Sequence, residues 1–214
     1  MTFTQAKTLL YIADPMCSWC WGFSPVMEAI GKKYQDHVNI QLLVGGLRPG
    51  NTERFDEHRR EYILGHWRAV HQRTGQPFNF DFQMGPDFTY DTEPASRAVV
   101  AVRKLQADQV FSFFQDVQRT FYVENLNVTK VEVLADLATS RGIDREQFLT
   151  SFQSAELRKE VLEEFDSCRK LNISGFPSLL TQDGQQVIPL AHGYQSIEAL
   201  TPLIDAWLEK ASVL

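Results

Sequence analysis

Two cysteines three positions apart, Cys17 and Cys20, are the residues of this 214-residue sequence best suited to covalent chemistry. They follow the apolar run 8–13, which predicts a buried strand, and they precede apolar residues at helical spacing. The pair is therefore expected on the first turn of a helix, where free backbone N–H groups and the helix dipole favour a thiolate over a neutral thiol. A thiolate in that position can attack a disulfide bond.

The two thiols are predicted to have different roles. Cys17 lies nearer the helix start and is expected to be the nucleophile, which would form a mixed disulfide with the substrate. Cys20 lies one turn further on and is expected to be more buried. It would attack the mixed disulfide and release the partner as a thiol. The spacing also permits a disulfide between the two cysteines.

Other uses of a cysteine pair remain open at this point. One is half of a zinc site, but no second such pair follows, and His66 and His71 lie roughly 45 residues further on. These histidines would diverge on a helix, so we predict no metal site. A structural disulfide and two inert buried thiols are the remaining alternatives. The third cysteine, Cys168, falls on the apolar stripe of a predicted helix, and we interpret it as a core residue.

Composition narrows the classes of partner. A net charge of −6 and a hydrophobic content of 43% indicate a soluble globular protein, and we expect neither nucleic acid nor an anionic membrane to bind it. No basic and apolar leader is visible before the first strand, and no apolar stretch approaches the ~18 residues of a membrane span. We therefore expect a cytoplasmic protein with largely reduced thiols, either a monomer or a homodimer.

The elements that position the cysteines follow a recognisable order. A second strand over 38–44, expected to be parallel to the first, ends at Gly45-Gly46. About a hundred residues dominated by helical patterns come next, followed by a long helix from about Ala155, a hairpin that turns at Asp183-Gly184 and a final helix. This order predicts an α/β core that carries a helical insertion.

Local signals refine three of the helices. One stripe is predicted to be buried in the first inserted helix: Tyr62, Ile63, Trp67 and Val70. Thr129 and Glu132 have the spacing of a capping box at a helix start. In the final helix Pro202 favours Thr201 over Ser196 as the N-cap, because proline suits the first helical position, while a kinked helix with an earlier start stays open.

Three motifs are specific enough to compare with known families: Asp14-Pro15-Met16-Cys17-Ser18-Trp19-Cys20-Trp21-Gly22-Phe23, Gly45-Gly46-Leu47-Arg48-Pro49-Gly50 and Glu93-Pro94-Ala95-Ser96-Arg97-Ala98. Together with Pro25 inside the first helix and a Gly-x-Pro loop before the terminal hairpin, they resemble the DsbA family of thioredoxin-like proteins. The resemblance covers essentially the whole chain. The motifs look like the signal-less, cytoplasmic, FrnE-like branch of that family.

The resemblance implies a thioredoxin-like fold with an all-helical insertion subdomain. Residues 1–47 and 153–214 would form the core, and residues 48–152 the insertion. It also implies an oxidoreductase or isomerase that acts on protein or low-molecular-weight disulfides, with Cys17 as nucleophile and Cys20 as resolving thiol. No cofactor beyond this redox-active pair is implied.

The same resemblance implies a substrate-binding surface. The bond before Pro177 would be cis, and the residue before it, Phe176, would pair with the substrate chain through its backbone. Relatives commonly have a smaller Thr or Val at that position. We assign Phe176, Pro177 and Trp19 to this surface.

A sister branch supplies the alternative function. The kappa-class glutathione transferases and 2-hydroxychromene-2-carboxylate isomerases share this architecture, typically carry Ser at the first cysteine position and use glutathione as cofactor. Both cysteines are present here, which favours dithiol chemistry, but glutathione binding at Cys17 stays open. Under this alternative, aromatic residues of the insertion would wall a substrate pocket: Phe78, Phe80, Phe82 and Tyr90. Arg97 and Glu93 would either line it or be solvated residues on the first turn of a helix.

Overall fold

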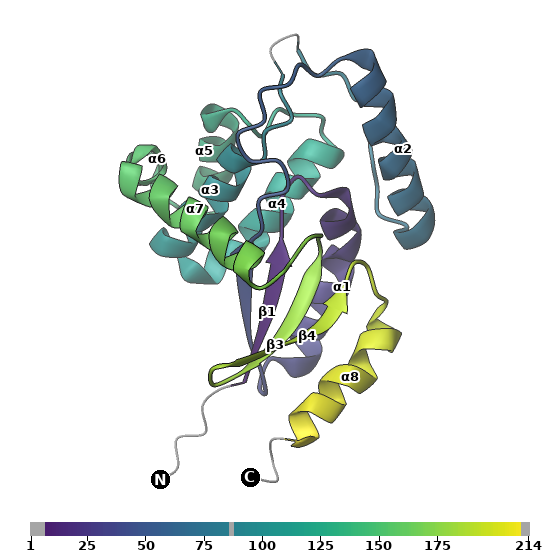
Figure 1. Cartoon of the computed structure of the whole chain (residues 1–214). Helices are drawn as coiled ribbons and strands as arrows, with labels where there is room; N and C mark the ends of the chain where they lie inside the picture. Colours follow the sequence, from purple (N-terminus) through teal and green to yellow (C-terminus); the bar gives the residue numbers. More distant parts are fainter. Residues whose placement is uncertain (1–6, 86–87, 211–214) are drawn as a thin grey trace.

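The computed structural model describes residues 7–85 and 88–210 of the chain. Its centre is a mixed four-stranded sheet in the order β2-β1-β3-β4 (Figure 1). The strands are β1 (Thr8–Ala13), β2 (Asn39–Val44), β3 (Ser178–Asp183) and β4 (Gln186–His192). β1 pairs in parallel with β2 and antiparallel with β3, and β4 forms the edge of the β3 hairpin. The predicted parallel pairing and terminal hairpin are confirmed.

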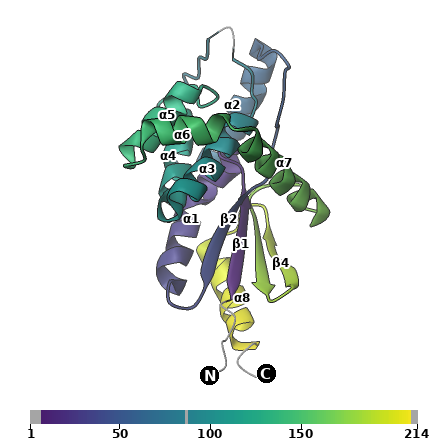
Figure 2. The same ribbon diagram turned by 90° about the vertical axis from the view of Figure 1, so that its left-hand side faces the viewer.

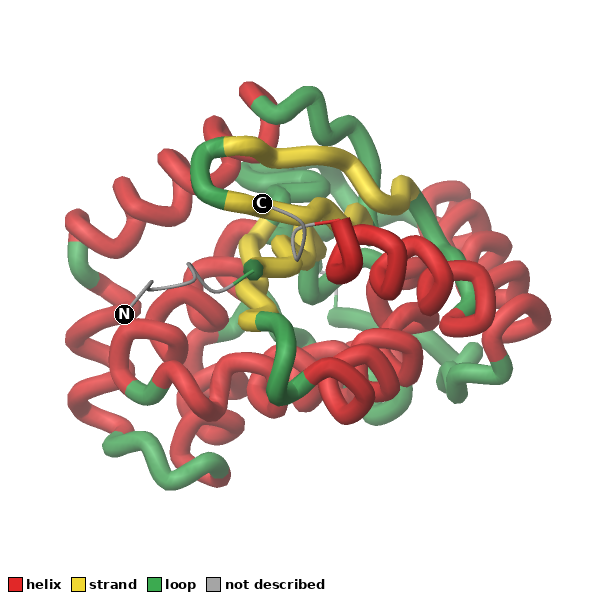
Figure 3. Tube along the Cα trace, turned by 90° about the horizontal axis from the view of Figure 1, so that it is seen from below, coloured by secondary structure: helices red, strands yellow, loops and turns green. Residues whose placement is uncertain are grey.

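Helices cover the sheet and extend beyond it. They are α1 (Ser18–Tyr34), α2 (Glu57–Thr74), α3 (Glu93–Leu105), η1 (Ala107–Gln109), α4 (Val110–Tyr122), α5 (Val131–Ser140), α6 (Arg145–Gln153), α7 (Ala155–Lys170) and α8 (Ile197–Lys210). Figure 3 shows helices on either side of the sheet when the molecule is seen from below. No helix in the described residues is both long enough and apolar enough to cross a membrane.

The two faces of the sheet pack into separate clusters, because successive side chains of a strand point to opposite sides. Leu9 and Tyr11 of β1 belong to the main core, which also contains the buried side of α1. Leu10 and Ile12 belong to a smaller cluster with Cys168 of α7. The interpretation of Cys168 as a core residue is confirmed.

The helical segments between β2 and α7 form the predicted insertion. Figures 1 and 2 show α3 to α6 gathered beyond the end of the sheet toward which β1 and β2 run. The predicted α/β class with a helical insertion is confirmed. We retain the boundaries 1–47 with 153–214 and 48–152 as a proposal. Residues 1–6 and 211–214, at the two ends of the proposed core, lie outside the described residues. The expectation that no leader precedes the first strand therefore falls largely on residues that the structure does not describe.

The buried face of α2 differs from the predicted stripe. Tyr62 is 56% exposed, and Leu64 is buried in its place together with Ile63, Trp67 and Val70. Tyr62 lies at the border between the apolar and the polar side of the helix, so spacing alone does not determine whether it is buried. The packing of α2 against α1 determines that Leu64 is covered and Tyr62 is exposed.

Two predicted helix caps are also wrong. The N-cap of α5 is Lys130, and the Thr129 hydroxyl instead donates a hydrogen bond to the Asn127 side chain at 2.6 Å. In α8 the favoured start at Thr201 is wrong and the alternative, an earlier start, is the one observed: the Ser196 hydroxyl accepts from the Ala199 N–H at 3.4 Å. The early start is favoured because it buries an additional apolar residue of α8, at the cost of enclosing Pro202 in the helix.

Candidate active site

The cysteine pair lies where β1 leads into α1. Cys17 is the N-cap residue of α1 and has an extended backbone, while Cys20 lies in the first turn. The chain turns here because the Cys17 N–H donates to the Asp14 carbonyl at 3.0 Å. No side-chain hydrogen bond caps this helix start in the described part of the chain. The first-turn N–H groups are therefore available to stabilise an anion at Cys17.

The two thiols differ in access and in protonation. Both are free, with Cys17 6% exposed and Cys20 completely buried. Burial, followed by the hydrogen bond to Cys17 and the charge of Cys17, raises the pKa of Cys20 well above its ordinary value of 9.0. The buried Tyr11 hydroxyl of β1 lies close to Cys20, and its pKa is raised first by burial and then by both cysteines. Cys20 is therefore held as a neutral thiol behind Cys17.

The loop before β3 closes over Cys17. Its Phe176–Pro177 peptide bond is cis, which is the geometry that the resemblance implies. The Cys17 thiol donates to the Phe176 carbonyl across 3.6 Å. Pro177 is buried, and the half-buried Phe176 ring packs so closely against Gly45 that a Cβ at Gly45 would overlap the ring. The loop is thus fixed against both Cys17 and the end of β2.

A cavity of about 290 Å³ opens beside Cys17. Cys17, Trp19 and Phe176 line it, together with Tyr62, Trp67 and Tyr90. The structure therefore brings three of the five sequence-predicted site residues to one cavity. The other two, Cys20 and Pro177, are buried. The largely apolar lining suits a ligand with an apolar portion.

Asp14 fastens the cysteine loop to two other segments. Its buried carboxylate accepts hydrogen bonds from the Met16 N–H at 2.8 Å and the Leu47 N–H at 2.7 Å. The Thr92 hydroxyl also bonds to Asp14 and accepts from the Arg48 N–H at 3.0 Å. Burial raises the pKa of Asp14 from 3.8 to about 6, although the hydrogen bonds from Leu47, Met16 and Thr92 oppose this rise.

The contribution of Asp14 to the free energy of unfolding is expected to fall as pH rises from about 4 to about 6. Asp14 holds its proton more tightly in the folded protein, with a pKa of about 6, than in the unfolded chain, so this stabilisation is lost as pH rises through the folded value. The difference corresponds to at most about 3 kcal/mol. Asp14→Asn stays neutral and should lack this component.

Urea denaturation of both proteins between about pH 4 and pH 7 measures this contribution. The stability of the wild type should decline relative to that of Asp14→Asn by up to about 3 kcal/mol across the range. Titration of other groups cancels in this comparison. A difference that stays constant with pH would contradict the assignment to Asp14.

Two predictions about the insertion need correction. Among the four aromatic residues proposed as a pocket wall, all of them described, Tyr90 alone lines the cavity beside Cys17. Phe78 and Phe82 instead pack against Trp67, with ring centroids 5.4 and 4.7 Å away. The Phe82 ring is fully buried in the core of the insertion, whereas the Phe78 ring is half-buried at its edge.

Glu93 and Arg97 neither line the cavity nor face solvent. They form an ion pair at 3.0 Å with side chains 15% and 7% exposed, respectively. Arg97 also donates to the Phe152 carbonyl at 3.0 Å, and its guanidinium lies over the Phe152 ring. The last residues of α6 thus cover this turn of α3, a contact that the sequence pattern does not show.

Sequence analysis missed Tyr11, Asp14 and Arg48 as site residues. A signal existed for Asp14, because an acidic residue that ends a buried apolar strand must have buried hydrogen-bond partners. Arg48 was present in a compared motif, but its place in the cavity lining depends on the fold. Within the described residues, no group of three or more His, Cys, Asp or Glu side chains is arranged to hold a metal ion.

Comparisons with known proteins agree with this geometry. The sequence profile of the DSBA-like thioredoxin domain matches residues 8–205. A solved structure from Nitrosomonas europaea, described as a candidate protein disulfide isomerase, is 41% identical with a TM-score of 0.91 and covers 96% of this chain and 99% of its own. The cytosolic disulfide reductase DsbM from Pseudomonas aeruginosa is 25% identical with a TM-score of 0.74 and covers 95% and 98%, respectively.

Two further comparisons are informative. A structure of DsbM with GSH is also 25% identical, with a TM-score of 0.73 over 97% of this chain and 100% of its own. Among curated proteins, the ClpXP adapter protein SpxH from Halalkalibacterium halodurans is 23% identical over 172 residues, which are 78% of this chain and 56% of SpxH. The chain thus spans about half the length of the curated relatives it matches.

Proposed function

Since the chain belongs to the DSBA-like thioredoxin domain family, we propose that it is a thiol–disulfide oxidoreductase or isomerase that uses Cys17 and Cys20 on disulfides of proteins or small molecules. One observation carries the proposal. Cys17 is the N-cap residue of α1, and its thiol lies at the edge of a cavity, 3.6 Å from the Phe176 carbonyl that precedes the cis proline. This arrangement gives an approaching disulfide both a nucleophile and a backbone acceptor.

The proposed reaction begins with the Cys17 thiolate. It attacks one sulfur of the substrate disulfide, the substrate S–S bond breaks, and the other substrate sulfur leaves as a thiolate that takes up a proton. Cys20 then loses its proton and attacks Cys17, which releases the second substrate thiol and leaves a Cys17–Cys20 disulfide. The substrate gains two electrons and the cysteine pair loses two. A dithiol or two small thiols must reduce the pair again.

The order of events follows from the protonation of Cys20. Burial and the neighbouring Cys17 raise the pKa of its thiol, so Cys20 does not compete with Cys17 for the substrate. Once Cys17 is bound in a mixed disulfide, its negative charge is gone and one cause of the raised pKa disappears. Cys20 can then release its proton and resolve the intermediate.

We also propose Phe176, Pro177 and Trp19 as the substrate-binding surface and glutathione as a small-molecule partner. The cavity beside Cys17 supports these proposals, as does the similarity to a DsbM structure with GSH. The similarity to a reductase described as cytosolic supports a cytoplasmic location and the FrnE-like placement. A monomer or homodimer remains our proposal for the assembly.

Replacing Cys20 by serine tests the proposed mechanism. Cys17 should still attack a disulfide in Cys20→Ser, but the mixed disulfide cannot be resolved from within the protein. We expect the adduct of one substrate thiol on Cys17 to accumulate and steady-state disulfide reduction to fall by about 100-fold or more. Mass spectrometry of the intact variant detects the adduct, and a coupled assay of substrate thiols measures the rate.

The wild type is the control, because it should pass through the same adduct and end as an intramolecular disulfide. Turnover that survives Cys20→Ser with glutathione present would contradict the dithiol mechanism. That outcome would favour the glutathione-dependent isomerase or transferase as the function.

A further inference from the structure

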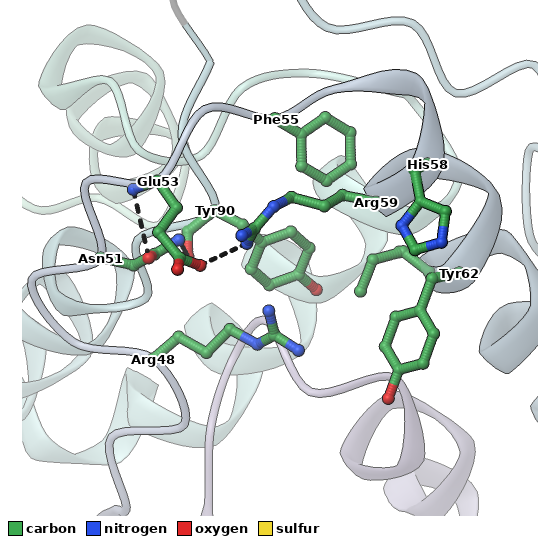
Figure 4. Close-up of a pocket in the computed structure, with 9 residues that line it drawn as sticks. Arg48, Asn51, Glu53, Phe55, His58, Arg59, Tyr62 and Tyr90 are labelled. Atoms are coloured by element: carbon green, nitrogen blue, oxygen red, sulfur yellow. Dashed lines mark hydrogen bonds and ion pairs between the residues drawn. The ribbon is translucent and has the colours of Figure 1, made fainter.

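A second cavity continues the one beside Cys17. Its volume is about 300 Å³. Four residues line both cavities: Arg48, Tyr62, Ile63 and Tyr90. Figure 4 shows Arg48 extending toward the side chains of Tyr90 and Tyr62, with Arg59 reaching in from α2. A substrate attacked by Cys17 can therefore extend past the two tyrosines into a second compartment.

The two arginines of this second cavity differ in how their charge is balanced. Arg59 forms an ion pair with Glu53. The hydrogen bond from Arg59 first, and the charge of Arg48 more weakly, hold the pKa of Glu53 below its ordinary value of 4.5. The Glu53 carboxylate thus lies near two guanidinium groups but forms its ion pair with Arg59. Among the described residues, the charge of Arg48 is left without a bonded counterion.

The surroundings of Arg48 would strengthen its interaction with an anion. Its side chain is half-buried, and its guanidinium lies over the Tyr90 ring at 5.8 Å. In the described part of the chain the guanidinium has no carboxylate at ion-pair distance. Aromatic rings form part of the cavity wall and reduce the access of water to the guanidinium, so a charge partner here contributes more than one on an open surface.

We propose that Arg48 binds a carboxylate of the substrate, and that the protein therefore acts by preference on small disulfides with anionic arms. This inference rests on the proposed oxidoreductase function. The planar guanidinium can donate two parallel hydrogen bonds to a carboxylate, which fixes the arm as well as attracting it. The two cavities, about 290 and 300 Å³, suit a compact molecule of a few residues.

The test compares three disulfides that differ in charge: glutathione disulfide, the neutral bis(2-hydroxyethyl) disulfide and the cationic cystamine. Arg48→Gln should lower kcat/KM for glutathione disulfide about 10-fold more than for the neutral disulfide, mainly through KM. Cystamine should react more slowly than the neutral disulfide with the wild type and lose this disadvantage with Arg48→Gln. Arg68→Gln is the matched control, because Arg68 is an exposed arginine of α2 outside both cavities.

A second measurement does not depend on the folding of any variant. Added salt should lower kcat/KM of the wild type for glutathione disulfide and leave the neutral disulfide unaffected, because only the charged contact is screened. Equal effects of Arg48→Gln on all three disulfides, or no charge dependence in the wild type, would overturn the role of Arg48 and leave the oxidoreductase intact. Failure of the wild type to reduce even the neutral disulfide would overturn the proposed function itself.

Discussion

Cys17→Ser is expected to abolish disulfide reduction, with kcat/KM lowered by at least about 1,000-fold. Serine keeps the size and position of the side chain at the start of α1. Its hydroxyl does not ionise in this setting and is a poor nucleophile toward sulfur, so the first step of the reaction is lost. Reduction of bis(2-hydroxyethyl) disulfide, followed by the release of its thiol, measures the effect without any contribution from substrate charge.

Cys168→Ala provides the matched control for Cys17→Ser. Cys168 is 1% exposed, its thiol faces the Val44 carbonyl at 3.7 Å, and burial raises its pKa to about 12. Such a thiol contributes to core packing and not to the reaction. Its loss should leave kcat/KM within about twofold while lowering the free energy of unfolding by about 1 kcal/mol. Activity retained in Cys17→Ser but lost in Cys168→Ala would reverse our assignment of the nucleophile.

Trp67→Ala is expected to cause the largest loss of stability, about 3–5 kcal/mol in the free energy of unfolding. Trp67 is 1% exposed at the centre of an aromatic cluster. Its ring lies 4.7 to 5.8 Å from four other aromatic rings, those of Phe78, Phe82, Phe121 and Tyr122. Truncation removes these contacts and leaves a cavity that the surrounding rings cannot fill. Urea denaturation followed by circular dichroism measures the loss.

Tyr62→Ala is the control on the same helix. Its side chain is 56% exposed, so its removal should change the free energy of unfolding by no more than about 0.5 kcal/mol. A large loss in Tyr62→Ala with a small one in Trp67→Ala would contradict the burial of α2 through the face that carries Trp67.

The elements that could be predicted from the sequence are those set by residues close together along the chain. The apolar run of β1 followed by helical spacing places Cys17 at the start of α1, because both signals lie within about one turn of the cysteines. The same holds for the second strand and the terminal hairpin, whose turn carries its own glycine. The DsbA resemblance supplied the loop that faces Cys17, which spacing alone does not place.

Features that depend on distant contacts escaped prediction. Asp14 acquires its role from the Leu47 N–H, 33 positions away, and Arg48 from the second cavity. Glu93 and Arg97 are buried because α6 covers them, and helical spacing does not show which other helix packs against these residues. In each case the surroundings of a polar side chain are set by tertiary packing, whereas local spacing only sets the helix or strand that carries it.

The close packing of Gly45 and Phe176 limits how this protein can diverge. Phe176 fits before Pro177 because Gly45 lacks the carbon atom that would collide with its ring. A side chain at position 45 would therefore require a smaller residue at position 176. The two positions are therefore expected to change together, which ties the shape of the loop above Cys17 to the residue that follows β2, more than a hundred positions earlier in the chain.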